Sequence, residues 1–274
     1  MAKDKENNSD FLSAYEKGAF AGNDPRCVPI TLDTPMLIGK KFPELEYSAE
    51  QHNTWHTLFK RQIKILENRA SEDFIKGITA LDLPADHLPS VHKINKKLHT
   101  FNDWQVGYSP GLLAGAQFIA ALAKRVIPST NYIREAHELD YTPAPDMFHE
   151  IFGHMPLITN PYFSEFFQDF GKASLNADEK TALKLERFYW FTVEFGLIQE
   201  TAGTRIYGAG ILSSYNETLH CLTDKVEKKP FKPAELANQD YDVWHMQPLL
   251  FVIESYEQLK TEFHDWAKYE LKIL

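Results

Sequence analysis

The sequence predicts a mainly α-helical fold with minor, short β-strands. Four segments of 15 to 24 residues carry apolar side chains at helical spacing, whereas the strand-like segments span ten residues or fewer. The 274-residue chain shows no internal repeat and no strong linker, so one large domain is expected. We expect residues 1–20 to form a flexible N-terminal segment and residues 21–274 to form that single domain.

The expected elements follow from capping residues and periodicity. Ser48 can cap a helix over 48–66, in which Trp55, Leu58 and Phe59 fall on one face. The other three expected helices lie at 110–124, 179–200 and 248–271, and Pro110 begins the first of these. Short strands are expected at 125–134, 205–214 and 240–244. Residues 20–45, rich in Pro, Gly and Asp, predict an extended loop.

Composition excludes several classes of protein. The net charge of −9 argues against general binding to nucleic acid or to an anionic membrane. Cys27 and Cys221 are isolated in the sequence, which indicates neither a disulfide framework nor a cysteine metal knuckle. The polar N-terminus lacks the apolar run of a signal peptide, and no segment approaches the roughly 20 apolar residues of a membrane span. A cytoplasmic protein is expected.

The segment YTPAPDMFHEIFGHMP, residues 141–156, carries the clearest chemical signal. Pro143 and Pro145 predict an extended entry into this segment. Asp146 is well placed to cap the short helix that should follow. The segment therefore predicts a short helix bearing His149.

His149 and His154 are five residues apart. In an unbroken α-helix this spacing points two side chains about 140° apart, so the two rings could not share one ion. We expect Gly153 to break the helix and Pro156 to prevent its continuation, so that His154 swings back beside His149. The expected break makes the pair candidate metal ligands.

Two other histidine pairs compete on spacing alone. His52 and His56 lie four apart on an expected helix, which is nominally better ligand spacing. His87 and His92 lie five apart, but Pro89 between them disfavours a helix. Spacing alone therefore decides little among the three pairs.

Glu194 strengthens the case for the first pair. It lies in FYWFTVEFGLI, among the most apolar stretches of the chain. An ionised carboxylate buried there without a partner would cost several kcal/mol, so it needs a cation, a proton or a strong donor. One interpretation is an ion pair with Arg187 or Arg205, and the other is a metal ligand.

Two histidines and one carboxylate on one face leave the other coordination positions of an ion open. This pattern is typical of mononuclear non-haem Fe(II) oxygenases. Zinc hydrolases also use two histidines and a glutamate, but their common helical signature is HExxH. HEIFGH has one residue too many, which argues against a metalloprotease.

The motifs PDMFHEIFGHMP, YWFTVEFGL and YGAGILSSY, in this order, resemble those of the pterin-dependent aromatic amino acid hydroxylases, and most closely the short bacterial phenylalanine hydroxylases. The resemblance runs from about Tyr47 to the C-terminus. It implies a single catalytic domain of the aromatic amino acid hydroxylase type. It also implies that L-phenylalanine is hydroxylated to L-tyrosine with O2, Fe(II) and a tetrahydropterin (tetrahydrobiopterin or a relative) as cosubstrate.

The resemblance further implies a role for each matching residue. The iron ligands would be His149, His154 and Glu194. The loop Gly111, Leu112 and Leu113 would meet the edge of the pterin, Phe118 would stack on its face, and Glu150 and Tyr189 would lie between pterin and iron. The substrate would be held by Arg134 at its carboxylate, by Thr142 and Ser213 at its backbone, and by Pro145 and Trp190 at its ring.

Two positions depart from the animal enzymes of this family. Gly115 stands where they carry a serine near the pterin, and Glu186 stands where they carry a small apolar residue, so the preferred pterin side chain is left open. The segment before Tyr47 is too short for a regulatory domain, and the chain stops just after its last amphipathic helix. We therefore expect a monomer or homodimer without regulatory-domain allostery.

Three other functions stay open from the sequence. A hydroxylase that prefers tryptophan or tyrosine would need only a few changed side chains in the pocket. A catalytically silent protein could sense an aromatic amino acid on the same fold, although all three candidate ligands are present. A zinc hydrolase would act with zinc alone.

Overall fold

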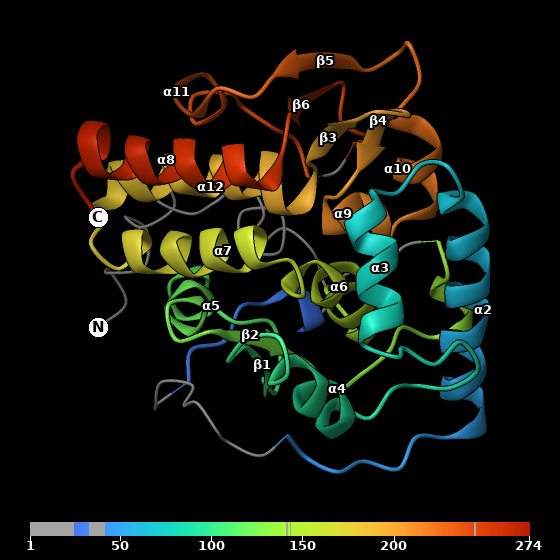
Figure 1. The fold of residues 1–274 in the computed structure, drawn as a ribbon. Coiled ribbons are helices and arrows are strands. Elements are labelled where there is room, and N and C mark those ends of the chain that lie inside the picture. Colours follow the sequence, from blue (N-terminus) through green and yellow to red (C-terminus); the bar gives the residue numbers. More distant parts are fainter. Residues whose placement is uncertain (1–24, 33–41, 141, 143, 244) are drawn as a thin grey trace, which may run out of the picture.

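The fold is known from a computed structural model that describes residues 25–274 apart from 33–41, 141, 143 and 244. Helices surround a buried centre, and two small sheets lie at opposite sides of the molecule (Figure 1). The mainly helical fold with short strands is confirmed. The expected flexible segment at 1–20, Pro143 and Trp244 fall outside the described residues, as does most of the loop expected at 20–45.

The described α-helices are α2 (Ala49–Leu66), α3 (Glu72–Ala80), α4 (Val91–Leu98), α5 (Gly115–Leu122), α6 (Met155–Ile158), α7 (Pro161–Ser174), α8 (Glu179–Tyr189), α9 (Ala209–Leu212), α10 (Tyr215–His220), α11 (Pro233–Leu236) and α12 (Tyr256–Asp265). Three π-helical segments are η4 (Phe148–His154), η5 (Trp190–Glu194) and η6 (Trp266–Leu271), and two 3-10 turns are η2 (Pro25–Cys27) and η3 (Ala136–Glu138). The strands are β1 (Gln105–Tyr108), β2 (Val126–Ser129), β3 (Leu197–Glu200), β4 (Gly203–Ile206), β5 (Glu227–Pro230) and β6 (Leu249–Ile253).

Helix α2 begins where the sequence predicts. The Ser48 side chain accepts a hydrogen bond from the Gln51 N–H, and the Ser48 N–H donates to Gln51 Oε1, which completes a capping box. Trp55 and Phe59 are buried on the inner face. Trp55 packs edge-on against Phe148, so α2 supports the segment that carries His149.

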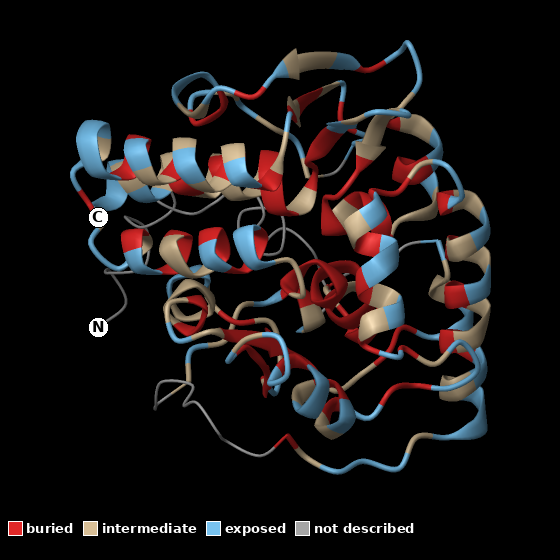
Figure 2. Ribbon diagram, viewed as in Figure 1, coloured by how far each residue is buried: buried red, intermediate tan, exposed pale blue. Residues whose placement is uncertain are grey.

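Helix α7 forms the aromatic centre of the core. Phe163, Phe166, Phe167 and Phe170 follow the i, i+3, i+4, i+7 pattern of one helical face, and all four are buried. The buried residues gather around the middle of the molecule, where α6, α7 and η4 meet (Figure 2). This rigid core supports the candidate functional residues from behind.

The two sheets are small. Strands β1 and β2 pair in parallel, and the second sheet has the order β4-β3-β6-β5. Strand β3 pairs antiparallel with β4 and parallel with β6. Strand β3 follows η5 directly, so the second sheet fixes the far end of the segment that carries Glu194.

Two expected helices are wrong in part because they include buried strands. The segment 179–200 is helical only to Glu194. The chain then turns at Gly196, where a Cβ atom would lie 2.4 Å from the Tyr207 hydroxyl, and continues as β3. The segment 248–271 begins with the central strand β6 before Ser255 caps α12. A buried central strand is a continuous apolar run, which periodicity alone cannot separate from a helix face.

The other errors are local. The helix expected at 110–124 begins at Gly115, because Leu112 and Ala114 instead bond to the backbone of Ile30. Only 126–129 of the strand expected at 125–134 is β2. The strand expected at 205–214 ends at Ile206 before α9, and 240–243 contain no strand. Every helix among the described residues is too short or too polar to cross a lipid bilayer.

Candidate active site

Three candidate ligands from two distant segments meet at one point. The Nε2 atoms of His149 and His154 lie 3.2 Å apart. Glu194 places Oε1 3.3 Å from His154 Nε2 and Oε2 3.7 Å from His149 Nε2. Two bonds of about 2.1 Å to a first-row divalent ion, at a right angle, would set two nitrogens about 3.0 Å apart. The arrangement fits a single ion with open positions.

A π-helix brings the two histidines together. Segment η4 runs through His149 and His154, and α6 follows it directly. In a π-helix each N–H bonds five residues back, so side chains five apart lie on the same face. The expected break at Gly153 is therefore wrong, and Pro156 does not end the helix but lies in the first turn of α6. Where the helix changes from π to α geometry, some backbone N–H groups have no carbonyl partner. Proline has no N–H, so it is tolerated at this position.

Gly153 serves close packing. A Cβ atom at this position would lie 3.1 Å from the Ala209 carbonyl oxygen of α9. Gly208, just before α9, is tighter, since its Cβ would lie 2.4 Å from the Glu194 carbonyl oxygen. Helix α9 is thus wedged against both ligand-bearing segments and fixes their separation.

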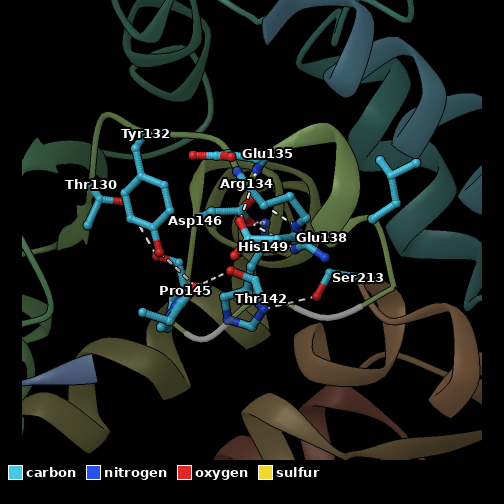
Figure 3. Close-up of polar contacts among 12 residues, drawn as sticks. Thr130, Tyr132, Arg134, Glu135, Glu138, Thr142, Pro145, Asp146, His149 and Ser213 are labelled. Carbon is cyan, nitrogen blue, oxygen red and sulfur yellow. Dashed lines mark hydrogen bonds and ion pairs between the residues drawn. The ribbon is translucent and has the colours of Figure 1, made fainter. Parts of the chain in front are cut away.

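Ser213 sets the tautomer of His149. Its Oγ lies 2.9 Å from His149 Nδ1 (Figure 3) and donates to the Ala209 carbonyl oxygen at 2.8 Å. The hydroxyl proton is used by Ala209, so Oγ accepts the Nδ1 proton of His149. His149 Nε2 is then left with its lone pair directed at His154 and Glu194, as a metal ligand requires.

The electrostatics of the group suit a cation. Burial opposes ionisation of Glu194, but His154 and His149 outweigh it and lower the pKa of Glu194 to about 2. Burial lowers the pKa of His149 to about 4. Burial opposes protonation of His154, but the carboxylates of Glu194 and Glu150 outweigh it and raise the pKa of His154. Glu194 is therefore ionised and His149 neutral, and a bound cation would displace the proton that His154 shares with Glu194.

Glu150 is a buried carboxyl group with an unsatisfied oxygen. Its side chain is 8% exposed, and Oε2 has no hydrogen-bond partner among the described residues although it lies 3.9 Å from His154 Nε2. Burial raises the pKa of Glu150 to about 8. A buried polar atom without a partner is costly, so this oxygen is placed to bind a ligand beside the three candidate metal ligands.

The competing sequence interpretations are not supported by the described contacts. Arg187 pairs with Asp240, and Arg205 donates to backbone carbonyls, so neither neutralises Glu194. His52 Nδ1 accepts from the Leu88 N–H, and His56 Nδ1 lies 2.9 Å from the Ala85 carbonyl oxygen. Among the described residues the one His/Cys/Asp/Glu group with metal-binding geometry is the group of His149, His154 and Glu194.

A cavity of about 820 Å³ opens on this group. It is lined by most of the site residues that the sequence suggests: Gly111, Leu112, Leu113, Phe118, Pro145, His149, Glu150, His154, Tyr189, Trp190 and Glu194. Its volume lies within the range of small-molecule sites, and its walls are mostly apolar with a few polar groups. The cavity has room for two small ligands side by side.

One wall is suited to a flat heterocycle. Phe118 packs edge-on to Tyr189 with ring centroids 6.0 Å apart. The Ile30 N–H donates to the Leu112 carbonyl oxygen and the Ala114 N–H donates to the Ile30 carbonyl oxygen, which holds the neighbouring loop. Ser109 Oγ donates to the Gly111 carbonyl oxygen. Aromatic faces and an ordered backbone edge lie on the same side of the cavity, as a stacked, hydrogen-bonding ring would need.

Trp190 forms a rigid part of the cavity wall. Its indole is stacked between Phe195 at 4.5 Å and Tyr241 at 4.4 Å. Its Nε1 donates to Gln247 Oε1 at 3.2 Å. The indole is thus fixed on both faces and at its edge.

Three of the suggested substrate residues do not line the cavity: Arg134, Thr142 and Ser213. Arg134 is buried and donates through Nε and Nη2 to Asp146, and neither contact uses Nη1 (Figure 3). Thr142 Oγ1 donates to the Ala144 carbonyl oxygen. All three residues therefore lie outside the lining of this cavity.

Sequence reasoning missed the supporting residues. Asp146 was expected only as a cap, and it does accept the His149 N–H at 3.0 Å, but it also pairs with Arg134. Tyr241 and Gln247, which fix Trp190, lie in a region interpreted as a strand or passed over. An isolated Tyr or Gln in a polar loop carries no local signal, since its contacts come from segments about 50 residues away.

Comparisons with known proteins agree with this geometry. The sequence model of the biopterin-dependent aromatic amino acid hydroxylases matches residues 31–273. The phenylalanine-4-hydroxylase of Pseudomonas aeruginosa is 41% identical over 215 residues, which cover 78% of this chain and 82% of that protein. The phenylalanine-4-hydroxylase of Chromobacterium violaceum is 44% identical over 215 residues, covering 78% of this chain and 72% of that protein.

A solved structure gives the same result in three dimensions. The Chromobacterium violaceum phenylalanine hydroxylase with bound iron(III) and oxidized cofactor 7,8-dihydrobiopterin superimposes with a TM-score of 0.78 at 41% identity. The match covers 83% of this chain and 84% of that one.

Proposed function

Since the chain belongs to the family of biopterin-dependent aromatic amino acid hydroxylases, we propose that it is a phenylalanine 4-monooxygenase. It hydroxylates L-phenylalanine to L-tyrosine with O2, a tetrahydropterin and non-haem Fe(II). The observation that carries this function is the convergence of two imidazoles and one carboxylate in the lining of the cavity. When bound, iron and pterin supply the electrons that activate O2.

The iron is held by His149, His154 and Glu194. Support comes from the 3.2 Å separation of the two Nε2 atoms, and from Ser213, which leaves His149 Nε2 unprotonated. Three protein ligands on one face leave room for water, O2 and substrate to approach from the cavity. Glu194 contributes the negative charge that a divalent cation needs in a buried site.

The pterin lies between the loop of Gly111, Leu112 and Leu113 and the ring of Phe118. Support comes from the flat apolar wall and the ordered backbone edge described above. Glu150 and Tyr189 lie between this wall and the candidate iron ligands. The unsatisfied Glu150 Oε2 is the atom that would exchange a hydrogen bond with the heterocycle and keep it in register with the iron.

The phenylalanine ring is held by Trp190 and Pro145, both of which line the cavity near the candidate iron ligands. Arg134 serves the substrate carboxylate through Nη1, the nitrogen that Asp146 does not use. Thr142 and Ser213 would orient the amino acid backbone, although neither lines the cavity and their hydroxyls donate to the Ala144 and Ala209 carbonyl oxygens. These side chains exclude water and set the ring position that faces the metal.

The test is tyrosine formation by Fe(II)-loaded protein. We expect phenylalanine to be converted to tyrosine in the presence of tetrahydrobiopterin and O2, with no conversion when the pterin is omitted. Glu194→Gln should abolish turnover, whereas Glu254→Gln, an exposed acidic residue after β6, should not. Turnover without pterin, or hydrolysis with zinc alone, would contradict the proposal. Competition with tryptophan and tyrosine measures substrate preference.

We also propose that the protein is cytoplasmic and is a monomer or homodimer. Support for the location comes from Cys221, a buried thiol that forms no disulfide, as suits a reducing compartment. Light scattering after gel filtration would test the oligomeric state, and a tetramer would contradict it.

A further inference from the structure

Residues 28–32, which we call the strap, pair with the loop between β1 and α5. The Ile30 N–H donates to the Leu112 carbonyl oxygen at 2.7 Å, and the Ala114 N–H donates to the Ile30 carbonyl oxygen at 2.9 Å. These two bonds form a parallel bridge between Ile30 and Leu113, as between neighbouring strands. The strap thus adds a second backbone layer to this loop.

Gln117 of α5 fixes the strap through its side chain. Its Oε1 accepts the Leu32 N–H at 2.7 Å, and its Nε2 donates to the Leu32 carbonyl oxygen at 2.8 Å. One side-chain amide therefore binds both backbone groups of a residue 85 positions earlier in the sequence. Such a pair has a fixed direction, because only the amide nitrogen can donate and only the amide oxygen can accept.

The strap packs on residues that are proposed to bind the pterin. A Cβ atom on Gly111 would lie 3.3 Å from Ile30 Cδ1, so the Ile30 side chain covers this glycine. Ile30 and Leu32 also pack against a small hydrophobic cluster that contains Leu113, and Phe118 packs against the same cluster. The strap therefore supplies part of the packing that holds the proposed pterin residues in place.

The strap also reaches the cavity itself. Pro29 lines the cavity together with Gly111, Leu112 and Leu113, whereas Gln117 is not part of the lining. The proline ring is rigid and apolar, which suits a wall that must keep its shape. A ligand against the loop thus meets the strap directly at Pro29, and the contact with Gln117 lies outside the ligand space.

We propose that the strap is part of the pterin site and that Gln117 is the positioning residue that holds it there. This inference rests on the proposed function, in which the loop of Gly111, Leu112 and Leu113 meets the edge of the heterocycle. A strap already fixed by Gln117 keeps this loop ordered before the pterin binds, which lowers the cost of ordering it on binding. Gln117 therefore raises pterin affinity without contacting the pterin.

The test measures binding of 7,8-dihydrobiopterin, a redox-inactive pterin, independently of turnover. Titration calorimetry gives its dissociation constant for wild type, Gln117→Glu, Gln117→Ala and Gln168→Glu. In Gln117→Glu the carboxylate can still accept the Leu32 N–H but offers no donor to the Leu32 carbonyl oxygen. Gln168 is the matched control, since its amide accepts from Arg125 and donates to the Ala123 carbonyl oxygen at the far end of α5, outside the cavity lining.

We expect both Gln117 variants to bind dihydrobiopterin about tenfold more weakly, because the freed strap must be ordered again on binding. Gln117→Ala adds no charge, so a shared loss excludes a charge effect. Gln168→Glu should change the constant less than about twofold. In turnover the KM for tetrahydrobiopterin should rise in the Gln117 variants while Fe(II) affinity and the KM for phenylalanine stay unchanged, which general loss of the fold would not produce. Equal weakening by Gln168→Glu, or unchanged or tighter binding by the Gln117 variants, would overturn the inference alone.

Hydrogen exchange on wild type tests the same point without a substitution. Because binding and ordering are coupled reciprocally, dihydrobiopterin should slow exchange of the Leu32 N–H, which bonds to Gln117 outside the cavity lining. The Glu72 N–H, which bonds to a Glu200 side-chain oxygen at the exposed start of α3, is the control and should exchange as before. Unchanged exchange at Leu32 would contradict the inference. Failure of wild type to bind dihydrobiopterin would overturn the proposed function and this inference with it.

Discussion

Arg134 and Asp146 form a buried, two-pronged ion pair behind the candidate iron ligands. Nε and Nη2 of Arg134 each lie 2.9 Å from a different oxygen of Asp146, and the two side chains are 5% and 0% exposed. Asp146 also accepts the backbone N–H groups of Arg134 and His149. One carboxylate thus joins the segment of the proposed substrate clamp to the start of the π-helix that carries the histidines.

Arg134→Ala should therefore do more than weaken phenylalanine binding. Removing the guanidinium leaves the Asp146 carboxylate buried without its cation, which costs about 3–5 kcal/mol of unfolding free energy. The measurement is urea unfolding of the apo-protein, with the apparent KM for phenylalanine measured in parallel. Arg187→Ala is the matched control, since its partner Asp240 is 86% exposed and such pairs contribute about 1 kcal/mol or less. Equal losses in the two variants would contradict the structural role of Arg134.

Ser213→Ala should weaken iron binding without unfolding the domain. His149 would lose the acceptor that holds its Nδ1 proton, so its ring could rotate or change tautomer. Losing such a partner typically reduces metal affinity by about 10- to 100-fold. Competitive chelator titration measures the affinity. Ser164→Ala, which removes a buried hydroxyl that donates to the Pro161 carbonyl oxygen in α7, should leave the iron affinity unchanged.

Gly208→Ala should displace Glu194. The added methyl group would lie 2.4 Å from the Glu194 carbonyl oxygen and from the Gly196 nitrogen, both of them backbone atoms that cannot move aside cheaply. We expect a loss of about 1–3 kcal/mol in stability together with weaker iron uptake. Gly115→Ala is the control, because a Cβ there meets nothing within 4 Å and should stabilise by about 0.4–1 kcal/mol. A Gly208→Ala variant as stable as wild type would show that α9 is not tightly wedged.

Glu217→Gln should change how stability depends on pH. Burial raises the pKa of Glu217 to about 7 in the folded protein, from 4.5. The folded state therefore holds the proton more tightly than the unfolded state. The contribution of Glu217 to the free energy of unfolding is fully present below pH 4.5 and is lost as the pH rises through 7. Glutamine avoids this loss and still accepts the Gln247 N–H.

The variant should exceed wild type by about 1–3 kcal/mol at pH 8, with the difference shrinking toward pH 5. Urea unfolding at the two pH values measures this. Glu257→Gln, exposed on α12, serves as the control and should show no such pattern. A difference independent of pH would mean that Glu217 is ionised in the fold over this whole range.

The sequence predicts much of the site because the chemistry is concentrated in short motifs. The apolar surroundings of Glu194 identify it as a buried acid in need of a cation, and the described contacts leave the metal group as its partner. The spacing of His149 and His154 was harder. In α-helical geometry a spacing of five residues requires a break at Gly153 for the two rings to meet, whereas the π-helix brings them together without a break. The π-helix packs closely against Ala209 of α9 at Gly153, a long-range contact that no local pattern records.

The remaining differences have the same origin. The start of α5 is moved to Gly115 by pairing with Ile30, 84 residues away from Ala114 in the sequence. Strand β6 lies between β3 and β5 and is apolar throughout, so it is indistinguishable from a helix face by period alone. The roles of Gln247 and Tyr241 also arise only when distant segments meet. Long-range contacts, not weak local preferences, account for what the sequence left undetermined.

The most direct test of the account is the amount of Fe(II) bound per chain, measured by metal analysis of anaerobically loaded protein. Wild type and His52→Ala should each bind one Fe(II) per chain, and Glu194→Gln should bind far less while staying folded. Full uptake by Glu194→Gln together with loss of uptake in His52→Ala would contradict the assignment of the metal site.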